Sequence, residues 1–599
     1  MAELLTENDL PISIEIKIDG SSLPATVEII GVSIVWEINR IAQATLKISD
    51  GGAFGLENDP FTNSESENFV PGKAIEIDLG YGDERSLSFK GIITGQRLVV
   101  RGETSYLSVT CKNKAFKLTK SRANQVMETS KDSDLFSQLI SNAGLTADVS
   151  SGQQYSYPLF QYNSSDWDYL VIRAEANNAF VLTDQDKVSV KEFDFSGSAD
   201  YSIQADMIVI DADLDLSGEN TFPDITLSSW DPKTQAVVSV TTSLSDNLEV
   251  SNLTANKLAE NTSNPGINKF TSAPVSQEEL MSFSKSWVSK AILSKVQGKI
   301  TILGTNKLKP GDLVELKNFN SRFNGTAFIS KIEHDCSEGD WKTRVFVGVN
   351  PRWHASLPGV QEEDGMGLLP GVKGTHLATV KKINEDPDNE YRVQVELSSF
   401  QADSGSNMLW ARLAFNYASN QAGIFFFPEV GDEVVLTFLN GDPRFPIIIG
   451  SLYSSKNKPK IEPDADNTQK AIHSKSGIEI LFNDQDKVLT IKTPAENTFI
   501  LDDEGKSITL KDCNNNECIM DNTGIKLSSA KDITLNAEGK IDIKAVTGIN
   551  LEASGGDIKG KGMNVDLEAD VSMKAAGNAS AEFSASGTTT VKGAMVMIN

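Results

Sequence analysis

The sequence predicts a mainly β protein with an N-terminal region of two β-barrels and a few helices, an OB-fold barrel, and a C-terminal intertwined trimeric β-helix. Three observations support this fold class. Two-residue alternation of apolar side chains dominates the chain, helical spacing is confined to a few segments, and the C-terminal residues repeat every eight positions. The 599 residues are enough for about four structural units of roughly 150 residues each.

Alternating apolar residues mark the strands of the N-terminal region. Residues 11–19 place isoleucine at every second position, so that one face of the strand is apolar. The segments 71–77 and 310–316 resemble each other, because each is a Pro-Gly turn that leads into an alternating strand, and each is followed by a Phe-X-Gly turn. Such a turn is common in any barrel, but the joint recurrence favours two related barrels at about residues 10–125 and 225–350.

Helical spacing is found in three segments of this region, at residues 132–144, 164–178 and 276–294. Gly144 can end the first helix. Ser165 is the expected N-cap of the second, because its hydroxyl can accept a hydrogen bond from a free backbone N–H of the first turn.

Two polar segments separate a compact β unit from the rest of the chain. Residues 359–371 are acidic and rich in glycine, and residues 456–472 are rich in lysine, proline and aspartate. Between them, residues 372–455 alternate like short strands joined by tight turns, which fits a small closed barrel of OB type. The flanking predicted domains are 1–358 and 473–599.

The C-terminal repeat runs in steps of eight residues from Ile533 onward, although the step at 557–564 is out of phase. Each step reads apolar–polar–apolar and then continues with small residues and a turn. A three-residue strand cannot bury two apolar side chains alone, whereas strands from several chains can share one core. A single-chain β-solenoid is the alternative, but eight residues make about one face of a coil, which favours a trimer. The predicted trimer core is Ile541, Ile543, Ile549, Leu551, Val565 and Leu567.

Composition and charge exclude several classes of function. The formal net charge of −27 argues against binding of nucleic acid through bulk electrostatics. The first residues lack the basic region of a secretory signal, so we expect synthesis in the cytoplasm. The closest cysteines, Cys513 and Cys518, have no further ligands nearby for a zinc site, and we expect no metal or other cofactor.

The unit at 372–455 carries a set of motifs in a specific order: YRVQV at 391–395, WAR at 410–412, PEVGDEV at 428–434, FLNGDPR at 438–444 and GSLY at 450–453. These motifs resemble the OB domain of the VgrG-type spikes of type VI secretion systems and of contractile phage tails. The residues that define the OB-fold motif are Pro428, Gly431, Asp432, Glu433, Gly441, Asp442 and Pro443.

The resemblance extends in both directions along the chain. Residues 161–175 are similar to a helix of the family's N-terminal domain, the hub, which contains two similar barrels. The family also ends in a trimeric β-helix, the needle, and the last nine residues resemble the blunt tip that receives a PAAR-type cap protein. The residues that would contact this tip protein are Met595, Met597, Ile598 and Asn599.

The resemblance implies a structural central spike of a contractile, phage-tail-like injection machine. As a homotrimer, it would join a hexameric, Hcp-like inner tube and the baseplate proteins to a needle that punctures the target membrane on firing, with effector cargo as a further partner. The particle would be a cytoplasmically assembled type VI system or a released extracellular one.

The sequence offers no catalytic constellation in support of an enzyme. The four histidines form no HExxH spacing, and no GxSxG or Walker-type motif is present. Asp432 and Glu433 are adjacent on an expected strand, so they would point to opposite faces and would not form a glycosidase pair. We expect no enzymatic activity. The alternatives are a tail-associated cell-wall-degrading enzyme and a trimeric adhesin with a β-prism stalk.

The substitution Leu551→Asp tests the eight-residue register. It introduces one charge per chain into the predicted shared core, where an unpaired charge costs on the order of several kcal/mol. We expect loss of a heat-resistant trimer, as measured by native mass before and after heating. A variant that remains a heat-resistant trimer would show that the register is wrong.

Overall fold

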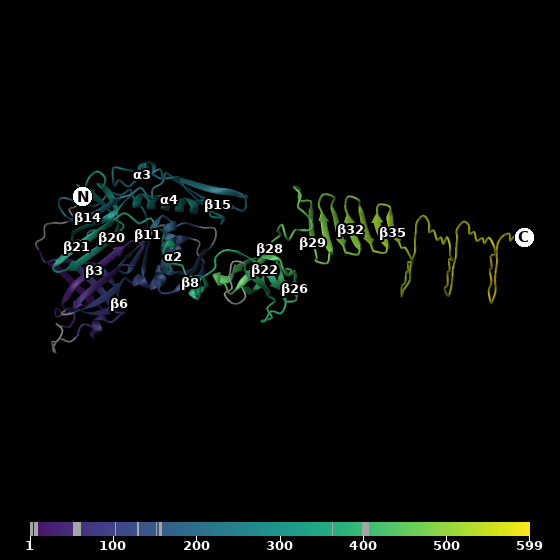
Figure 1. Cartoon of the computed structure of the whole chain (residues 1–599), viewed down its shortest axis with the longest axis horizontal. Coiled ribbons are helices and arrows are strands. Elements are labelled where there is room, and N and C mark those ends of the chain that lie inside the picture. Colours follow the sequence, from purple (N-terminus) through teal and green to yellow (C-terminus); the bar gives the residue numbers. More distant parts are fainter. Residues whose placement is uncertain are drawn as a thin grey trace. The chain divides into compact units, whose positions relative to one another are not determined.

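The computed structural model describes residues 4, 10–51, 61–101, 104–128, 131–150, 152–154, 158–361, 363–397 and 407–598. The chain divides into two compact units, Met1–Leu452 and Tyr453–Asn599. Strands are the main regular elements of the first unit and the only ones among the described residues of the second (Figure 1), which confirms the mainly β fold class. No helix in the described part of the chain is both long and apolar enough to cross a membrane.

A 13-stranded sheet forms much of the first unit, in the order β14-β18-β21-β20-β3-β4-β7-β6-β5-β1-β2, with β19 also paired to β20 and β13 to β19. One half of the sheet comes from the strands before residue 113, and the other half from the strands between residues 201 and 347. The strands are β1 (Ile12–Ile18), β2 (Ser21–Ser22), β3 (Ile29–Glu37), β4 (Gln43–Ser49), β5 (Ala74–Tyr81), β6 (Glu84–Arg101), β7 (Thr104–Lys112), β13 (Tyr201–Gln204), β14 (Val209–Leu216), β18 (Val296–Leu303), β19 (Leu313–Lys317), β20 (Gly325–Ser337) and β21 (Asp340–Val347).

This sheet differs from the expected pair of separate barrels at 10–125 and 225–350. The two halves are joined because β3 pairs antiparallel with β20, and strand pairing closes neither half among the described residues. The pairing satisfies the backbone groups that each half would otherwise expose at an edge. The second half also begins earlier than expected, at β13, because residues 224–271 contribute β15, β16 and β17 to a sheet of their own.

The three helices expected from apolar spacing are confirmed, with ends within two residues of those predicted. Ser165 caps the second of them, since its hydroxyl accepts a hydrogen bond from Asp168 N at 3.1 Å. A short additional helix, α3, was not anticipated. The helices are α1 (Asp132–Asn142), α2 (Asp166–Ala176), α3 (Ala255–Asn261) and α4 (Gln277–Ser294).

Three smaller sheets accompany the helices in the first unit. Strands β11, β12 and β9 form a sheet whose buried residues pack with those of α1 and α2, and α4 packs on the sheet β16-β15-β17. A two-stranded sheet pairs β10 with β8. The strands are β8 (Arg122–Met127), β9 (Thr146–Val149), β10 (Leu159–Ser165), β11 (Ala179–Asp184), β12 (Lys187–Glu192), β15 (Asp224–Asp231), β16 (Ala236–Ser243) and β17 (Ile267–Thr271).

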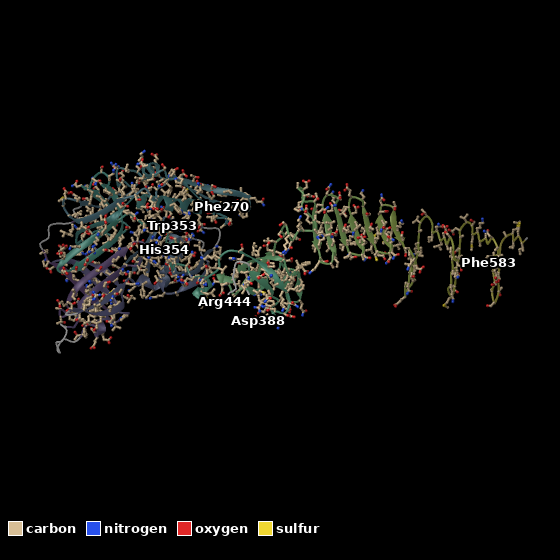
Figure 2. All side chains as sticks on the ribbon, viewed as in Figure 1. Phe270, Trp353, His354, Asp388, Arg444 and Phe583 are labelled. Carbon is tan, nitrogen blue, oxygen red and sulfur yellow. The ribbon has the colours of Figure 1, made fainter. Side chains whose placement is uncertain are left out.

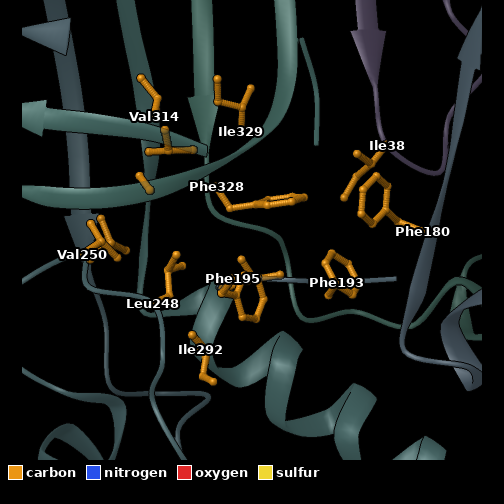
Figure 3. Close-up of a cluster of buried hydrophobic side chains, with 14 of the residues drawn as sticks. Ile38, Phe180, Phe193, Phe195, Leu248, Val250, Ile292, Val314, Phe328 and Ile329 are labelled. Atoms are coloured by element: carbon orange, nitrogen blue, oxygen red, sulfur yellow. The ribbon is translucent and has the colours of Figure 1, made fainter. Parts of the chain in front are cut away.

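The largest hydrophobic core lies under the second half of the large sheet and is centred on aromatic side chains (Figure 3). The Phe328 ring makes edge-to-face contacts with Phe180 and Phe193, each at a centroid distance of 5.6 Å. Such pairs contribute about 0.5–1.5 kcal/mol beyond the burial of their area. A second core lies under the first half of the sheet, so each half has a core of its own.

The expected OB-type barrel is confirmed as a closed barrel of five strands in the order β22-β23-β24-β28-β27. Its interior is filled by small and branched apolar side chains such as Val380, Val395 and Leu436, all fully buried. Its strands are β22 (His376–Lys382), β23 (Val393–Leu397), β24 (Met408–Leu413), β27 (Glu433–Phe438) and β28 (Pro446–Ser451), and a small hairpin pairs β25 (Ala418–Ser419) with β26 (Ala422–Gly423).

The second unit begins as a meander in which seven five-residue strands each pair with the next. Its first strand starts inside the segment expected to be a linker, 456–472, because backbone pairing with β30 continues past the last apolar side chain. The strands are β29 (Gln469–His473), β30 (Glu479–Asn483), β31 (Val488–Lys492), β32 (Thr498–Asp502), β33 (Ser507–Lys511), β34 (Glu517–Asp521) and β35 (Gly524–Ser528).

The aromatic core can be tested with the substitution Phe328→Ala. Removal of a buried phenylalanine ring leaves a cavity and costs about 3–5 kcal/mol, so we expect a lower melting temperature for the first unit in calorimetry. Phe270→Ala is the matched control, because Phe270 is 63% exposed whereas Phe328 is 2% exposed. Equal effects of the two substitutions would contradict this description of the core.

Candidate assembly surface in the second unit

One face of the seven-stranded meander is apolar except for Lys470 on its first strand. Residues two apart on a strand share a face, and the strand register places them opposite similar residues on the next strand. The result is two apolar ladders that run across the sheet, which we call the ladder face. The first ladder is Ile472, Ile480, Ile491, Phe499, Leu510, Cys518 and Leu527, and the second is Lys470, Phe482, Leu489, Leu501, Ile508, Met520 and Ile525.

The opposite face of the meander is mixed and more polar. Its central row contains both apolar and polar residues: Ala471, Leu481, Thr490, Ile500, Thr509, Ile519 and Lys526. Charged residues flank that row, and among them Lys460 and His473 both contact the Glu479 carboxylate and hold its pKa below the ordinary range. This face therefore differs from the ladder face in carrying polar and charged side chains beside the apolar ones.

No described residue of the second unit covers the ladder face. None of the described residues of the second unit is buried, and ladder residues such as Leu510 and Ile525 are 57% and 71% exposed. A groove of about 630 Å³ follows the first ladder, where it is lined by Ile491, Phe499 and Leu510 among others. Full burial of each such side chain stabilises a protein by about 1.5–3 kcal/mol, which makes the ladder face a candidate surface for association.

The eight-residue steps continue beyond the meander without strands of their own. Residues 530–598 form no helix or strand in the single chain, and Figure 1 shows them as an extended segment with repeated turns. The residues expected to form the trimer core are all exposed there: Ile541 52%, Ile543 64%, Ile549 54%, Leu551 70%, Val565 63% and Leu567 73%. Their shared core therefore stays a prediction, since one chain has no means to bury them.

The residues of the OB-fold motif shape the turns of the barrel. Gly431 adopts a left-handed backbone conformation (φ 97°) between Pro428 and β27, where Glu433 is the first residue. The Asp432 carboxylate accepts a hydrogen bond from Glu429 N at 2.9 Å, which closes the turn. The arrangement gives Asp432 a structural partner and does not bring a second carboxylate to it.

The second motif turn is held by an ion pair. The Asp442 carboxylate is 6% exposed and accepts hydrogen bonds from Arg444 Nε at 3.0 Å and from Arg444 Nη2 at 2.6 Å. These bonds hold the pKa of Asp442 below its ordinary range. Gly441 precedes it with φ 69°, and Pro443 follows it within the turn.

The residues expected at the tip are exposed and lie in no regular element. Met595, Met597 and Ile598 are 80%, 83% and 90% exposed, and Asn599 lies outside the described residues. The four cysteines are free thiols, and no group of three or more His, Cys, Asp or Glu side chains within the described ranges could hold a metal ion.

Sequence reasoning placed the needle at 473–599 but missed the ladders of the meander. The signal was present only in part, because Leu489 and Ile491 flank Thr490, and Ile508 and Leu510 flank Thr509, whereas apolar residues interrupt the alternation in the neighbouring strands: Leu481, Ile500 and Ile519. The eight-residue phase begins only at Ile533, and the meander has longer steps, so a search at one period does not detect both parts.

Two family models match the chain. The first, described as the Alg8 N-terminal domain, matches residues 8–338. The second, described as the type VI secretion system/phage-baseplate injector OB domain, matches residues 376–453.

Curated relatives include type VI secretion system spike proteins. VgrG3 of Vibrio cholerae is 35% identical over 101 residues, which are 16% of this chain and 10% of that protein. VgrG1a of Pseudomonas aeruginosa is 27% identical over 150 residues, which are 23% of each chain. The matches thus span less than a quarter of the length of these relatives.

Solved structures similar to this chain include tail proteins of prophages. The 43 kDa tail protein of prophage MuSo2 from Shewanella oneidensis has 12% sequence identity and a TM-score of 0.44, and the alignment covers 57% of this chain and 98% of that one.

The ladder face can be tested with two adjacent substitutions on β33. Leu510→Asp places a charge on the ladder face, whereas Thr509→Asp places the same charge on the opposite face. We expect Leu510→Asp to abolish self-association of the purified chain and Thr509→Asp to preserve it, as measured by light scattering. The reverse result, or association of both variants, would exclude the ladder face as the contact surface.

Proposed function

The chain belongs to the Alg8 N-terminal domain family and is a VgrG-type spike protein, and from this premise we propose that it acts as a homotrimeric, non-enzymatic central spike of a contractile injection machine. The proposed role is mechanical. The first unit would connect to the inner tube and baseplate, and the second unit would form the needle that transmits force to a membrane.

The observation that carries the proposal is the unburied ladder face of the second unit. A sheet with one apolar face needs a partner layer, and the second unit of a single chain supplies none among its described residues. Three copies around one axis would turn their ladder faces inward and leave the mixed faces in water. The same axis would allow the exposed residues of the eight-residue steps, from Ile541 to Leu567, to form a continuous shared core.

The two sheet halves of the first unit support a role in joining a three-fold needle to a six-fold tube. Each chain contributes two strand-rich sheet halves, with their own cores, so a trimer would present six such halves. We propose that these halves face a hexameric ring of an Hcp-like inner tube, with baseplate proteins around it. A three-fold needle would thereby join a six-fold tube.

The far end of the second unit is the proposed site of the tip. Met595, Met597 and Ile598 expose apolar side chains that a PAAR-type cap protein would cover. The proposed particle is assembled from chains made in the cytoplasm and acts there or after release as an extracellular injection particle, with effector cargo as a further partner.

The carboxylates of the OB barrel support the absence of catalysis in the proposed role. Asp432 is bonded within its own turn, and Asp442 is bonded to Arg444, so each carboxylate already has a structural task. We propose that the barrel acts as the neck between hub and needle and does not cleave cell-wall polymers.

The proposal is tested first by the native mass of the purified full chain, measured by light scattering before and after mild heating. We expect three times the chain mass of 64.9 kDa, with the trimer retained after heating. A monomer would overturn the spike and reopen the single-chain solenoid. A trimer that degrades peptidoglycan would identify a cell-wall enzyme, and a trimer that binds glycans or cells through its first unit would identify an adhesin.

A further inference from the structure

A cavity of about 580 Å³ lies in the first unit, between α4, the start of β17 and the segment 350–353. Its size is within the range of about 300–1,000 Å³ that is usual for binding pockets. We call it the tryptophan cavity, and Figure 2 labels Trp353 on it and Phe270 on the neighbouring strand β17. The charged and aromatic side chains in its lining are Glu219, Phe222, Trp287, Lys290, Arg352 and Trp353.

Aromatic rings form one wall of the cavity. The Trp287 and Trp353 rings lie at a centroid distance of 5.0 Å, and Phe283 packs on Trp353 at 4.9 Å. The Lys290 ammonium lies 4.2 Å from the centroid of the Trp353 ring, in the geometry of a cation–π contact. Aromatic surfaces of this kind are frequent hot spots of protein interfaces.

A network of buried charges holds this wall in place. Glu175 accepts hydrogen bonds from Lys290 Nζ at 2.7 Å and from His354 N at 2.9 Å, one on each carboxylate oxygen. The His354 ring pairs with Asp168 through Nε2 and Oδ1 at 2.8 Å. Because His354 follows Trp353 directly, these bonds fix the tryptophan, and the cavity is formed before any partner arrives.

Two hydrogen-bond donors at the cavity are unused. The Arg352 guanidinium is exposed at the rim and makes no ion pair or side-chain hydrogen bond with the described residues. The indole N–H of Trp287 is buried and also lacks an acceptor within the described ranges. A partner with a carboxylate next to apolar or aromatic side chains would match this surface.

On another surface, the first unit exposes apolar and aromatic side chains close to a carboxylate. Val126 and Phe160 are paired across β8 and β10, and both are 59% exposed. Tyr162, two residues after Phe160, is 73% exposed. We call these three residues the aromatic ridge. Glu128 lies two residues beyond Val126, is exposed, and makes no ion pair with the described residues.

We propose that the aromatic ridge of one copy docks into the tryptophan cavity of the next copy, with Glu128 of the ridge paired to Arg352 at the rim. This inference rests on the proposed trimer and assigns its contact in the first unit. A three-fold ring requires two different complementary surfaces on each chain. The ridge and the cavity meet this requirement in composition and in charge, and each copy would use both surfaces once.

Cross-linking within the assembled protein tests this contact. The full chain with Cys513→Ser and Cys518→Ala, which removes the two cysteines that are not buried and keeps the ladder face apolar, would carry Glu128→Cys and Arg352→Cys together. After treatment with a short bismaleimide, we expect covalent dimers and trimers on a denaturing gel. The two single-cysteine chains are the controls and should give monomers only. Monomers from the double variant, with or without a link inside one chain, would overturn the proposed contact.

A charge-reversal cycle gives an independent measurement. Glu128→Arg and Arg352→Glu should each lower the melting transition of the first unit in the trimer, and the double variant should restore it at least in part. Additive effects would overturn the pairing. The native mass distinguishes failure of the docking contact from failure of the proposed function. A trimer without this coupling refutes only the docking contact, whereas a monomer refutes the proposed spike itself.

Discussion

The structure depends on one constraint: the second unit has an apolar sheet face that the described residues of that unit do not cover. Each of the seven strands contributes only two side chains to the ladder face, and no described residue of this unit is buried. In the proposed trimer, other copies would cover the ladders, so folding and association of this unit would be coupled. The proposed spike function follows from this requirement, as do the roles proposed for the short strands and for the exposed isoleucines of the eight-residue steps.

The first unit meets the opposite condition. It has its own hydrophobic cores, a capped helix α2 and a closed barrel, and its two sheet halves satisfy each other's edges where β3 pairs with β20. Buried charges such as Glu175 and Lys290 are paired inside the chain. The first unit thus buries apolar side chains in its own cores, whereas the second unit leaves its ladder face exposed, and the proposed hub contact would link neighbouring copies through surfaces that are already formed.

Local sequence patterns predicted single strands and helices well, but they did not predict which distant strands pair. The isoleucines of residues 12–18 identify β1 because alternation is a property of one strand, and Ser165 identifies the start of α2 because capping involves neighbouring residues. The pairing of β3 with β20 joins residues about 300 positions apart, and no local pattern encodes it. The ladders of the meander can be identified only once the strand register is known, and the sequence alone does not give that register. The predicted trimer core of the needle involves contacts between chains, which the sequence of one chain does not specify.

Alternation in the meander specifies which face is turned inward as well as which residues form strands. On β33, Ile508 and Leu510 belong to the ladder face, while Thr509 lies on the other, so a shift of one residue would exchange the two faces. On the mixed face Lys511 lies opposite Glu517 in this register, and a shift of one residue would separate these two opposite charges. The net charge of −27 adds repulsion between copies at long range. In the proposed trimer, association would therefore come from the contact of ladder with ladder, which is short-ranged and depends on register, and this would favour an ordered needle over indiscriminate aggregation.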